Sequence, residues 1–216
     1  MARRVTQTDG DDGDVGRRTQ ADRTATANRR MIRAATKLIA RQGYTKTSMA
    51  QVGKEAGYTG GLVSHHFGSK EGLLRDLVRC IAERFYADHI YPAVEGLSGI
   101  GALCALVDTY INELAVRQEH MRALYVLMGE ALGPVSEINE VFVELNRGFR
   151  VNACGVIRAG ILEGEIRGEL DPEAEAGLFV GMLRGVAMQW MADPGCFDLN
   201  TVSESIKDAL RGHLEA

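Results

Sequence analysis

The sequence predicts an all-α protein, with a small helical domain at its N-terminal end and a larger helical domain behind it. From about Thr26 onward, apolar residues recur at the three- and four-residue spacing that places them on one face of a helix. Glycines, prolines and small polar residues, which typically end or begin helices, separate these segments. Apolar and polar residues nowhere alternate over a stretch long enough to indicate a β-strand.

Charge is distributed unevenly along the 216 residues, which carry a formal net charge of −4. Residues 1–75 contain 14 lysines and arginines against 7 acidic residues, a net of +7, whereas residues 76–216 have a net of −11. This asymmetry suits a basic domain that approaches phosphate and an acidic domain that stays away from it. Chance clustering would give the same counts.

The first segment, residues 1–27, is polar and has almost no large apolar side chain, so we expect a disordered N-terminal arm. It lacks the apolar core of a signal peptide, and no later stretch approaches the ~20 apolar residues of a membrane span. We therefore expect a cytoplasmic protein that has no membrane partner.

Two helices are predicted next, at the start of a domain that we assign to residues 28–88. The first has its apolar residues on one face and ends at Gly43, where a left-handed backbone is favoured. Ser48, followed three residues later by Gln51, indicates a capping box that begins the second helix. Gly57 ends this second helix after about two turns.

A third short helix is predicted over residues 60–67, with Thr59 as its N-cap. Val63 and Phe67 lie four residues apart and are expected to face inward, where they would hold this helix on its neighbours. A longer helix with an apolar stripe then begins at Lys70.

The second and third helices form the arrangement known as the helix-turn-helix. In such domains the first member braces the second, whose N-terminal half enters the ~12 Å wide major groove of DNA. Gly60 and Gly61 allow the backbone to approach phosphate or base closely, and the free N–H groups at this helix start attract anions. Ser64, His65 and His66 can donate hydrogen bonds to phosphate or base acceptors. The sequence therefore predicts a DNA-binding domain.

Residues 28–80 resemble the N-terminal domain of the TetR family of transcriptional regulators. The matching residues are Ala56-Gly57-Tyr58-Thr59, Gly61, Val63, His66-Phe67 and Ser69-Lys70-Glu71-Gly72-Leu73-Leu74. Ser64 stands where the family frequently has tyrosine, and Gly53 stands where it commonly has alanine. The run Gly-Leu-Val-Ser-His-His-Phe is closer to the branch that includes BetI, the choline-responsive repressor.

This resemblance implies that Thr47 and Thr59 contact phosphate at helix starts and that Lys70 binds phosphate. It also implies that the strip from Gly60 to His65 faces the bases. The DNA-binding residues expected from the motif and the resemblance are Lys46, Thr47, Ser48, Thr59, Gly60, Gly61, Leu62, Ser64, His65, His66 and Lys70.

The rest of the chain, residues 89–216, is predicted to be helical. Asp171-Pro172 begins a helix that is apolar nearly all round to about residue 192, which indicates burial on more than one side. Its glycines recur every four residues, at positions 177, 181 and 185, and suggest close contact with another helix. Asn200 is expected to cap the last helix.

The ending Gly-Val-Ala-Met-Gln-Trp-Met-Ala-Asp-Pro…Phe-Asp resembles the C-terminal domain of the BetI-like branch. The resemblance implies an all-α protein with an N-terminal three-helix helix-turn-helix DNA-binding domain plus a C-terminal helical ligand-binding and dimerisation domain. Its implied partners are a double-stranded DNA operator of near-palindromic sequence, a second copy of the chain and a small-molecule effector. Binding of that effector would release the repressor from DNA.

Aromatic and sulfur-containing side chains of the body are candidates to line an effector pocket, although most such residues belong to a core. The candidates are Tyr110, Tyr125, Met128, Phe142, Phe149 and Trp190. A quaternary amine held in an aromatic cage is one candidate effector, and an apolar metabolite or drug fits equally well.

We see no pattern typical of catalysis, since there is no nucleophile elbow, no paired acid and base and no cofactor fingerprint. The histidines of the body are isolated, so we expect neither a metal site nor a cofactor. The alternative is a small-molecule binding protein or an enzyme with a helical body and a non-functional head.

Overall fold

The computed structural model describes residues 20–133 and 136–216, without the side chains of residues 136 and 137. Regular structure in these residues is helical, apart from one isolated bridge between Ile166 and Glu215, so the predicted all-α fold is confirmed. The helices are α1 (Gln20–Gln42), α2 (Met49–Ala56), α3 (Gly60–Phe67), α4 (Lys70–Phe85), the π-helix η1 (Tyr86–Ile90), α5 (Tyr91–Val94), α6 (Gly99–Val116), α7 (Gln118–Ala131), α8 (Ser136–Leu162), α9 (Pro172–Ala192) and α10 (Leu199–Leu214).

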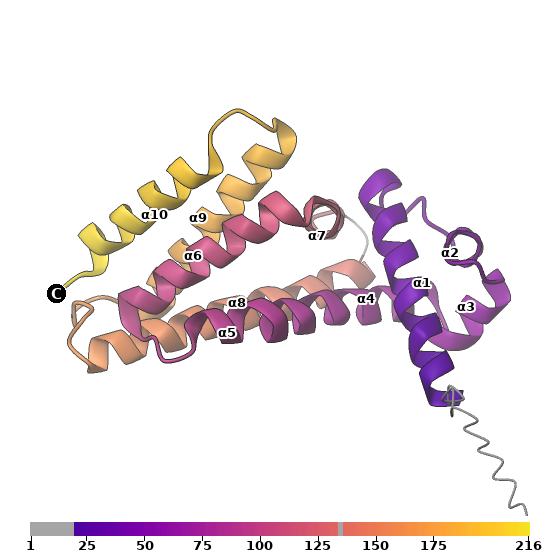
Figure 1. Ribbon diagram of the computed structural model, residues 1–216, viewed down its shortest axis with the longest axis horizontal. Coiled ribbons are helices and arrows are strands. Elements are labelled where there is room, and N and C mark those ends of the chain that lie inside the picture. Colours follow the sequence, from indigo (N-terminus) through magenta and orange to yellow (C-terminus); the bar gives the residue numbers. More distant parts are fainter. Residues whose placement is uncertain (1–19, 134–135) are drawn as a thin grey trace, which may run out of the picture.

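The molecule is elongated, with α1, α2 and α3 forming a head at one end and α6 to α10 a body at the other (Figure 1). The continuous helical run α4–η1–α5 leads from the head into the body, and α8 packs beside it. The boundary expected after residue 88 therefore falls inside a helix rather than in a linker. The C-terminus lies at the end of the body far from the head (Figure 1).

The first helix begins earlier than the sequence suggests. It starts at Gln20, so residues 20–27, which we expected to belong to the disordered arm, are helical. Asp22 lies in the first turn, where a negative charge interacts favourably with the helix dipole, and Ala27 packs against the head core. Residues 1–19 lie outside the described part of the chain, and the prediction of disorder there stays a prediction.

Helix α7 of the body completes the hydrophobic core of the head. Leu74 and Leu77 of α4 are fully buried in one cluster with Leu127 of α7 and Ile138 of α8. The head core is thus shared between the head and the body, and α1 packs along α7. A displacement of α7 would therefore change the packing of α1 and α4 in the head.

A second core joins α6, α8, α9 and α10, with Leu103, Ile157 and Phe179 among its buried members. By length and composition alone, α6 is apolar enough to cross a membrane, but half of it is buried inside this body. A core helix that is packed on several sides by other helices has a similarly apolar composition.

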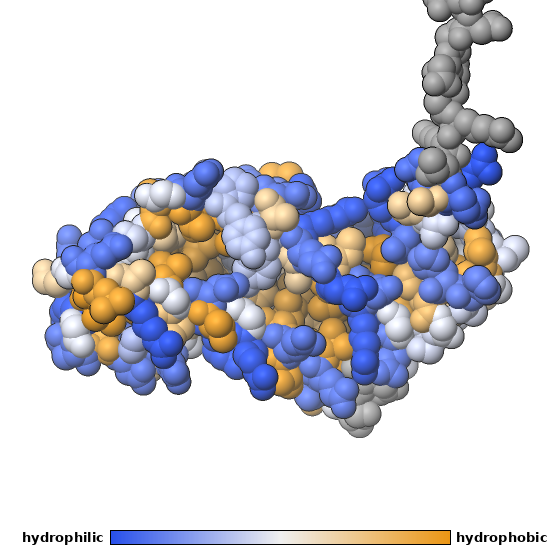
Figure 2. Space-filling view, turned by 90° about the horizontal axis from the view of Figure 1, so that it is seen from below, coloured by the Kyte–Doolittle hydropathy of each residue, from blue (hydrophilic) through white to orange (hydrophobic). Residues whose placement is uncertain are grey.

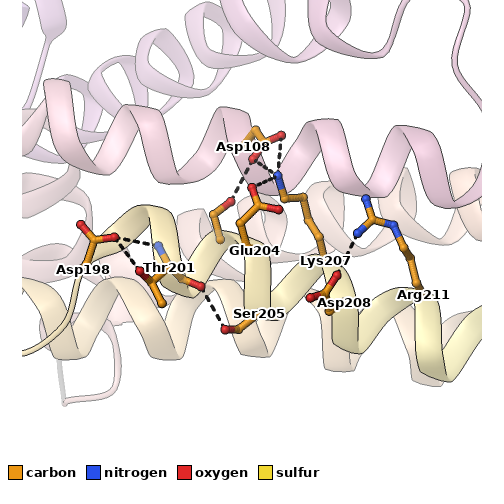
Figure 3. A network of polar contacts seen from close by, with 9 residues as sticks. Asp108, Asp198, Thr201, Glu204, Ser205, Lys207, Asp208 and Arg211 are labelled. Carbon is orange, nitrogen blue, oxygen red and sulfur yellow. Dashed lines mark hydrogen bonds and ion pairs between the residues drawn. The ribbon is translucent and has the colours of Figure 1, made fainter.

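Hydrogen bonds and ion pairs join the last helix, α10, to α6 (Figure 3). Lys207 of α10 is 8% exposed, and its Nζ lies 2.9 Å from Asp108 Oδ1 of α6 and 2.7 Å from Glu204. Hydrogen bonds to Glu204 and Asp108 raise the pKa of Lys207. The N-cap of α10 is Asp198, which accepts a 2.8 Å hydrogen bond from the Thr201 N–H, so the prediction of Asn200 as cap is wrong.

Candidate DNA-binding surface and effector cavity

The predicted helix-turn-helix is present, and its two helices are in backbone contact. A methyl group at Gly53 would lie 2.7 Å from the backbone nitrogen of Gly60, and one at Gly60 would lie 2.8 Å from the Cα of Ala50. Real side chains do not tolerate such distances to backbone atoms, so this crossing requires glycine at both positions. Gly53, a departure from the family pattern, thus allows α2 and α3 to approach each other closely.

Ser48 and Thr59 cap the helices of the head as predicted. Ser48 and Gln51 form the full capping box of α2, which ends at Gly57 with a left-handed backbone. The Thr59 hydroxyl accepts a 3.2 Å hydrogen bond from the Leu62 N–H and begins α3. The orientation of α3 is therefore fixed from its first turn.

Helix α3 presents one face to solvent and the other to the head core. Val63 is 0% exposed and Phe67 8%, as predicted, and these two side chains hold the helix. The exposed members of the predicted set on this helix are Gly61, Leu62, Ser64 and His65, and His66 is half-buried with its ring against Phe67. On this outer face, Ser64 and His65 carry hydrogen-bond donors of the kind that contact base edges or phosphates.

Two of the predicted phosphate contacts are engaged in internal bonds. Thr47 is 4% exposed and lies in the turn, where its hydroxyl donates a 2.7 Å hydrogen bond to the Gly43 carbonyl. The helix start that we expected there is formed by Ser48 instead. The Lys70 ammonium donates to the Thr45 carbonyl at 3.2 Å and lies 4.2 Å from the centre of the Tyr44 ring. Phosphate binding by Lys70 stays a prediction, as does binding by the exposed Lys46.

A carboxylate of the body holds the turn between α1 and α2. Glu130 of α7 accepts hydrogen bonds from the backbone N–H groups of Tyr44, at 2.9 Å, and Thr45, at 3.3 Å. A methyl group at Gly43 would lie 2.8 Å from Glu130 Oε1, and Gly43 has a positive φ of 83°. Glycine suits this position because of its left-handed backbone, and a side chain here would also displace the Glu130 carboxylate from the turn.

The body contains a cavity of about 210 Å³ lined by residues of α4, η1, α5, α6, α7, α8 and α9, which we call the central cavity. Of the six predicted residues, Tyr110, Met128 and Phe149 line it. Tyr125 and Phe142 line a neighbouring cavity that shares Met128 and Arg184 with the central one. The body surface seen in Figure 2 carries hydrophobic residues in patches among hydrophilic ones.

Trp190 does not line the central cavity. It packs instead in a small cluster around Leu114, Met121 and Ala187. The central cavity also includes residues that the sequence did not suggest, among them Phe85, Tyr86 and Arg184. Phe85 and Tyr86 flank the start of η1, and nothing in the sequence predicts that the helix changes its pitch there.

Tyrosine hydroxyls, the side-chain amide of Asn152 and one arginine supply the polar groups of this region. The hydroxyls of Tyr110 and Tyr125 lie 2.6 Å apart, and Tyr125 also donates to the backbone carbonyl of Arg184 at 3.3 Å. Burial raises the pKa of both tyrosines, so both stay neutral. The Arg184 guanidinium lies 5.4 Å from the centre of the Phe149 ring.

A second cavity of about 260 Å³ lies between α1 of the head and the body, and shares Phe85, Tyr110, Leu124 and Phe149 with the central cavity. It contains Glu113, which is 6% exposed and has His89 Nε2 at 3.3 Å and Arg117 Nε at 3.4 Å. Groups of three or more metal-ligating side chains are absent from the part of the chain that the structure describes.

Comparisons with known proteins agree with this geometry. The family model for bacterial regulatory proteins of the tetR family matches residues 31–77, and that for the C-terminal domain of BetI-type transcriptional repressors matches residues 100–215. The transcriptional repressor KstR2 of Rhodococcus jostii (strain RHA1) is 29% identical over 195 residues, which cover 89% of this chain and 88% of KstR2.

Two solved structures share the fold at low sequence identity. The transcriptional regulator FadR from Bacillus subtilis in complex with stearoyl-CoA has a TM-score of 0.76 at 22% identity, covering 84% of this chain and 96% of that one. A putative transcriptional regulator from Saccharomonospora viridis in complex with choline has a TM-score of 0.75 at 18% identity, covering 89% and 99%. The BetI-type match spans more than half of the sequence. The chain therefore belongs to the tetR family of bacterial regulatory proteins and is a transcriptional regulator with a BetI-type C-terminal domain.

Proposed function

We propose that the chain represses transcription as a homodimer whose two α3 helices bind a near-palindromic operator, and that a small molecule in the central cavity releases it. The observation that carries this proposal is the position of α7. Leu124 and Met128 of this helix line the central cavity, and Glu130, half a turn further on, holds the turn of the helix-turn-helix. One rigid element thus joins a ligand site to the DNA-binding surface.

The proposed release follows from this connection. A ligand changes operator affinity only if it binds the DNA-competent and the incompetent conformers with different affinity. A molecule that fits the central cavity better when α7 has shifted would also shift the Glu130 carboxylate and α1. The distance between the two α3 helices of a dimer would then no longer match two successive major grooves.

The proposed dimer uses the exposed face of α9. Gly177, Gly181 and Gly185 are four residues apart, and apart from the adjacent backbone of α9 itself, no atom of the described residues would lie within 4 Å of a methyl group at any of them. The close helix contact that these glycines suggest is therefore not made within one chain. Leu178 and Met188 on the same helix are 63% and 59% exposed, which supplies apolar surface for a second copy.

The test uses the purified chain and a duplex taken from the DNA upstream of its own gene. We expect nanomolar binding at low salt, with two chains per operator and half-sites about one helical turn apart. Affinity should fall steeply as salt rises. An absence of preference for any such duplex over random competitor DNA would contradict the proposal. Turnover of a metabolite without DNA would favour an enzyme instead, and we expect none. A regulator of this kind acts on the chromosome, so we place it in the cytoplasm.

A further inference from the structure

The central cavity contains one formal charge, and it is positive. Arg184 is the only lysine or arginine of α9, a helix that is otherwise largely apolar along its length. Its side chain lines the central cavity beside Phe149 and is only partly exposed to solvent. None of the residues that line this cavity is an aspartate or a glutamate.

Arg184 also lacks a carboxylate partner among the side chains that the structure describes. No carboxylate oxygen of that part of the chain lies within 4.0 Å of its nitrogens. The groups that act on it electrostatically are the hydroxyls of Tyr110, Tyr125 and Tyr86 and a second cation, Arg150. Burial lowers the pKa of Arg184, but a guanidinium stays protonated in proteins.

Burying part of a charge without a counterion costs free energy. A ligand that brings a negative charge to Arg184 would offset this cost. The aromatic rings of Phe85, Tyr86 and Phe149 offer apolar surface to the rest of such a ligand. They could also attract a cation, but Arg184 lies over one of these rings and would repel it.

The fold alone does not decide between these two ligand charges. Solved structures with nearly equal TM-scores, 0.76 and 0.75, are complexes with stearoyl-CoA and with choline, which carry opposite charges. The side chains that line the cavity therefore determine which ligand charge is favoured. The positive charge of Arg184 disfavours the quaternary amine that the sequence suggested as one candidate.

We propose that the central cavity binds an amphiphilic organic anion, with its apolar body among the aromatic rings and its carboxylate or phosphate paired with the Arg184 guanidinium. Arginine favours such groups because its planar fork can donate two parallel hydrogen bonds to them. The volume of about 210 Å³ is below the ~300–1,000 Å³ of drug-sized sites, so the body is a slim chain or a single ring system. This inference rests on the proposed role of the cavity as the effector site.

A matched series of ten-carbon probes tests the charge. Decanoate, 1-decanol and decyltrimethylammonium share one alkyl chain and differ in the sign of the head group. We expect calorimetry on the full chain to show decanoate binding at least about tenfold more tightly than either of the others, which corresponds to ~1.4 kcal/mol. Decyl phosphate, compared with decanoate, shows whether a phosphate or a carboxylate is the better anion.

Three variants assign the effect to Arg184. Arg184→Met keeps an unbranched side chain of similar volume and removes its charge, so the preference for decanoate over 1-decanol should disappear. Arg184→Lys keeps the charge and should retain most of the preference. Arg147→Met, an exposed arginine of α8 that does not line the cavity, is the matched control and should bind as the unaltered chain does.

The proposal fails if decyltrimethylammonium binds as tightly as decanoate, if none of the three probes binds more tightly than about 1 mM, or if Arg184→Met keeps the preference. The comparison of the three probes needs only the unaltered chain, so it stands even if a variant does not fold. Calorimetry needs no DNA. If decanoate binds through Arg184 but leaves operator affinity unchanged, the ligand class is right and the effector role is wrong.

Discussion

Lys70 and His65 occupy positions that predict two different kinds of DNA contact. Lys70 lies at the start of α4, beside the turn that Glu130 holds, whereas His65 is exposed on the outer face of α3. An ammonium that meets phosphate contributes equally on every sequence, and a side chain that meets base edges discriminates among them.

Lys70→Ala should weaken binding to all duplexes and reduce the slope of log affinity against log salt by about 1. His65→Ala should cost about 1–3 kcal/mol on the operator and little on random DNA. Fluorescence anisotropy titrations at several salt concentrations measure both effects. Arg158→Ala, whose charge pairs with Glu173 on the body, is the control and should change neither. Operator binding that both changes left untouched would refute these assignments.

Local chemistry explains why the capping residues were predictable. A helix start is indicated by residues no more than three positions apart, such as Ser48 with Gln51. The structure forms the capping hydrogen bonds expected for Ser48 and for Thr59. The cap of α10 was misread because Asp198 and Asn200 are both good caps. Leu199, which packs against the body core, settles the choice by placing the helix start directly after Asp198.

Charged residues with distant partners could not be predicted. Glu130 meets Tyr44 across 86 positions of the chain, and Glu113 is buried with His89 and Arg117 although a carboxylate is normally exposed. Arg184 is visible in the sequence as the single cation of an apolar helix. The sequence alone does not show which cavity this side chain lines.

At the scale of elements, α7 is the helix on which the proposed regulation depends. Glu130→Ala should remove two hydrogen bonds to a charged acceptor and lower the free energy of unfolding by about 1–3 kcal/mol. The Tyr44 and Thr45 amides should then exchange hydrogen faster, because no carboxylate holds them. Hydrogen exchange with mass spectrometry measures this loss at the turn, and urea unfolding measures the stability.

Glu119→Ala on the same helix is the control for this prediction, since Glu119 is exposed in the first turn of α7. It should leave exchange at the turn unchanged. If Glu130→Ala also leaves the turn protected, and the variant binds the operator as the unaltered chain does, α7 does not position the head through this carboxylate.

The contact between α6 and α10 depends on Lys207. Lys207→Met should lower the free energy of unfolding by about 1 kcal/mol, because the carboxylates of Asp108 and Glu204 lose the cation between them while staying largely in solvent. The pKa of Lys207 is raised in the folded chain. Its contribution is therefore fully present below the ordinary value of 10.5 and is lost only as pH rises through the higher folded value.

Urea unfolding of both chains at several pH values measures this difference in stability. It should stay constant from about pH 7 to pH 9 and shrink above about pH 10.5. Arg211→Met is the control, because Arg211 pairs with Asp208 on the surface of the same helix. A difference that disappeared already at neutral pH would show that the network does not hold α10.

At the scale of the whole molecule, the basic head and the acidic body agree with an elongated protein that touches DNA at one end only. Two such molecules must be joined by their bodies to place both heads on one face of a duplex. The open glycine face of α9 is the described surface that best fits this role, because its backbone can approach a partner helix closely.

Gly181→Arg tests this pairing directly. A single chain has room for the new side chain, since among the described residues no atom beyond the adjacent backbone of α9 would lie within 4 Å of its Cβ, and arginine favours a helix more than glycine does. The monomer should therefore fold, whereas a partner helix at this face would be pushed away. We expect light scattering to report half the mass of the unaltered chain. Operator affinity should fall by at least about 100-fold, because each half-site is then bound alone.

Gly101→Arg is the matched control, because Gly101 is an exposed helical glycine of α6 with equally open surroundings. Both variants add the same charge and the same bulk, so a difference between them reports position and not chemistry. If the two behave alike, as dimers with full operator affinity, the glycines of α9 do not face a second copy. The pairing surface would then have to lie on another part of the body, and α9 would matter to the protein only through Arg184 and the wall of the central cavity.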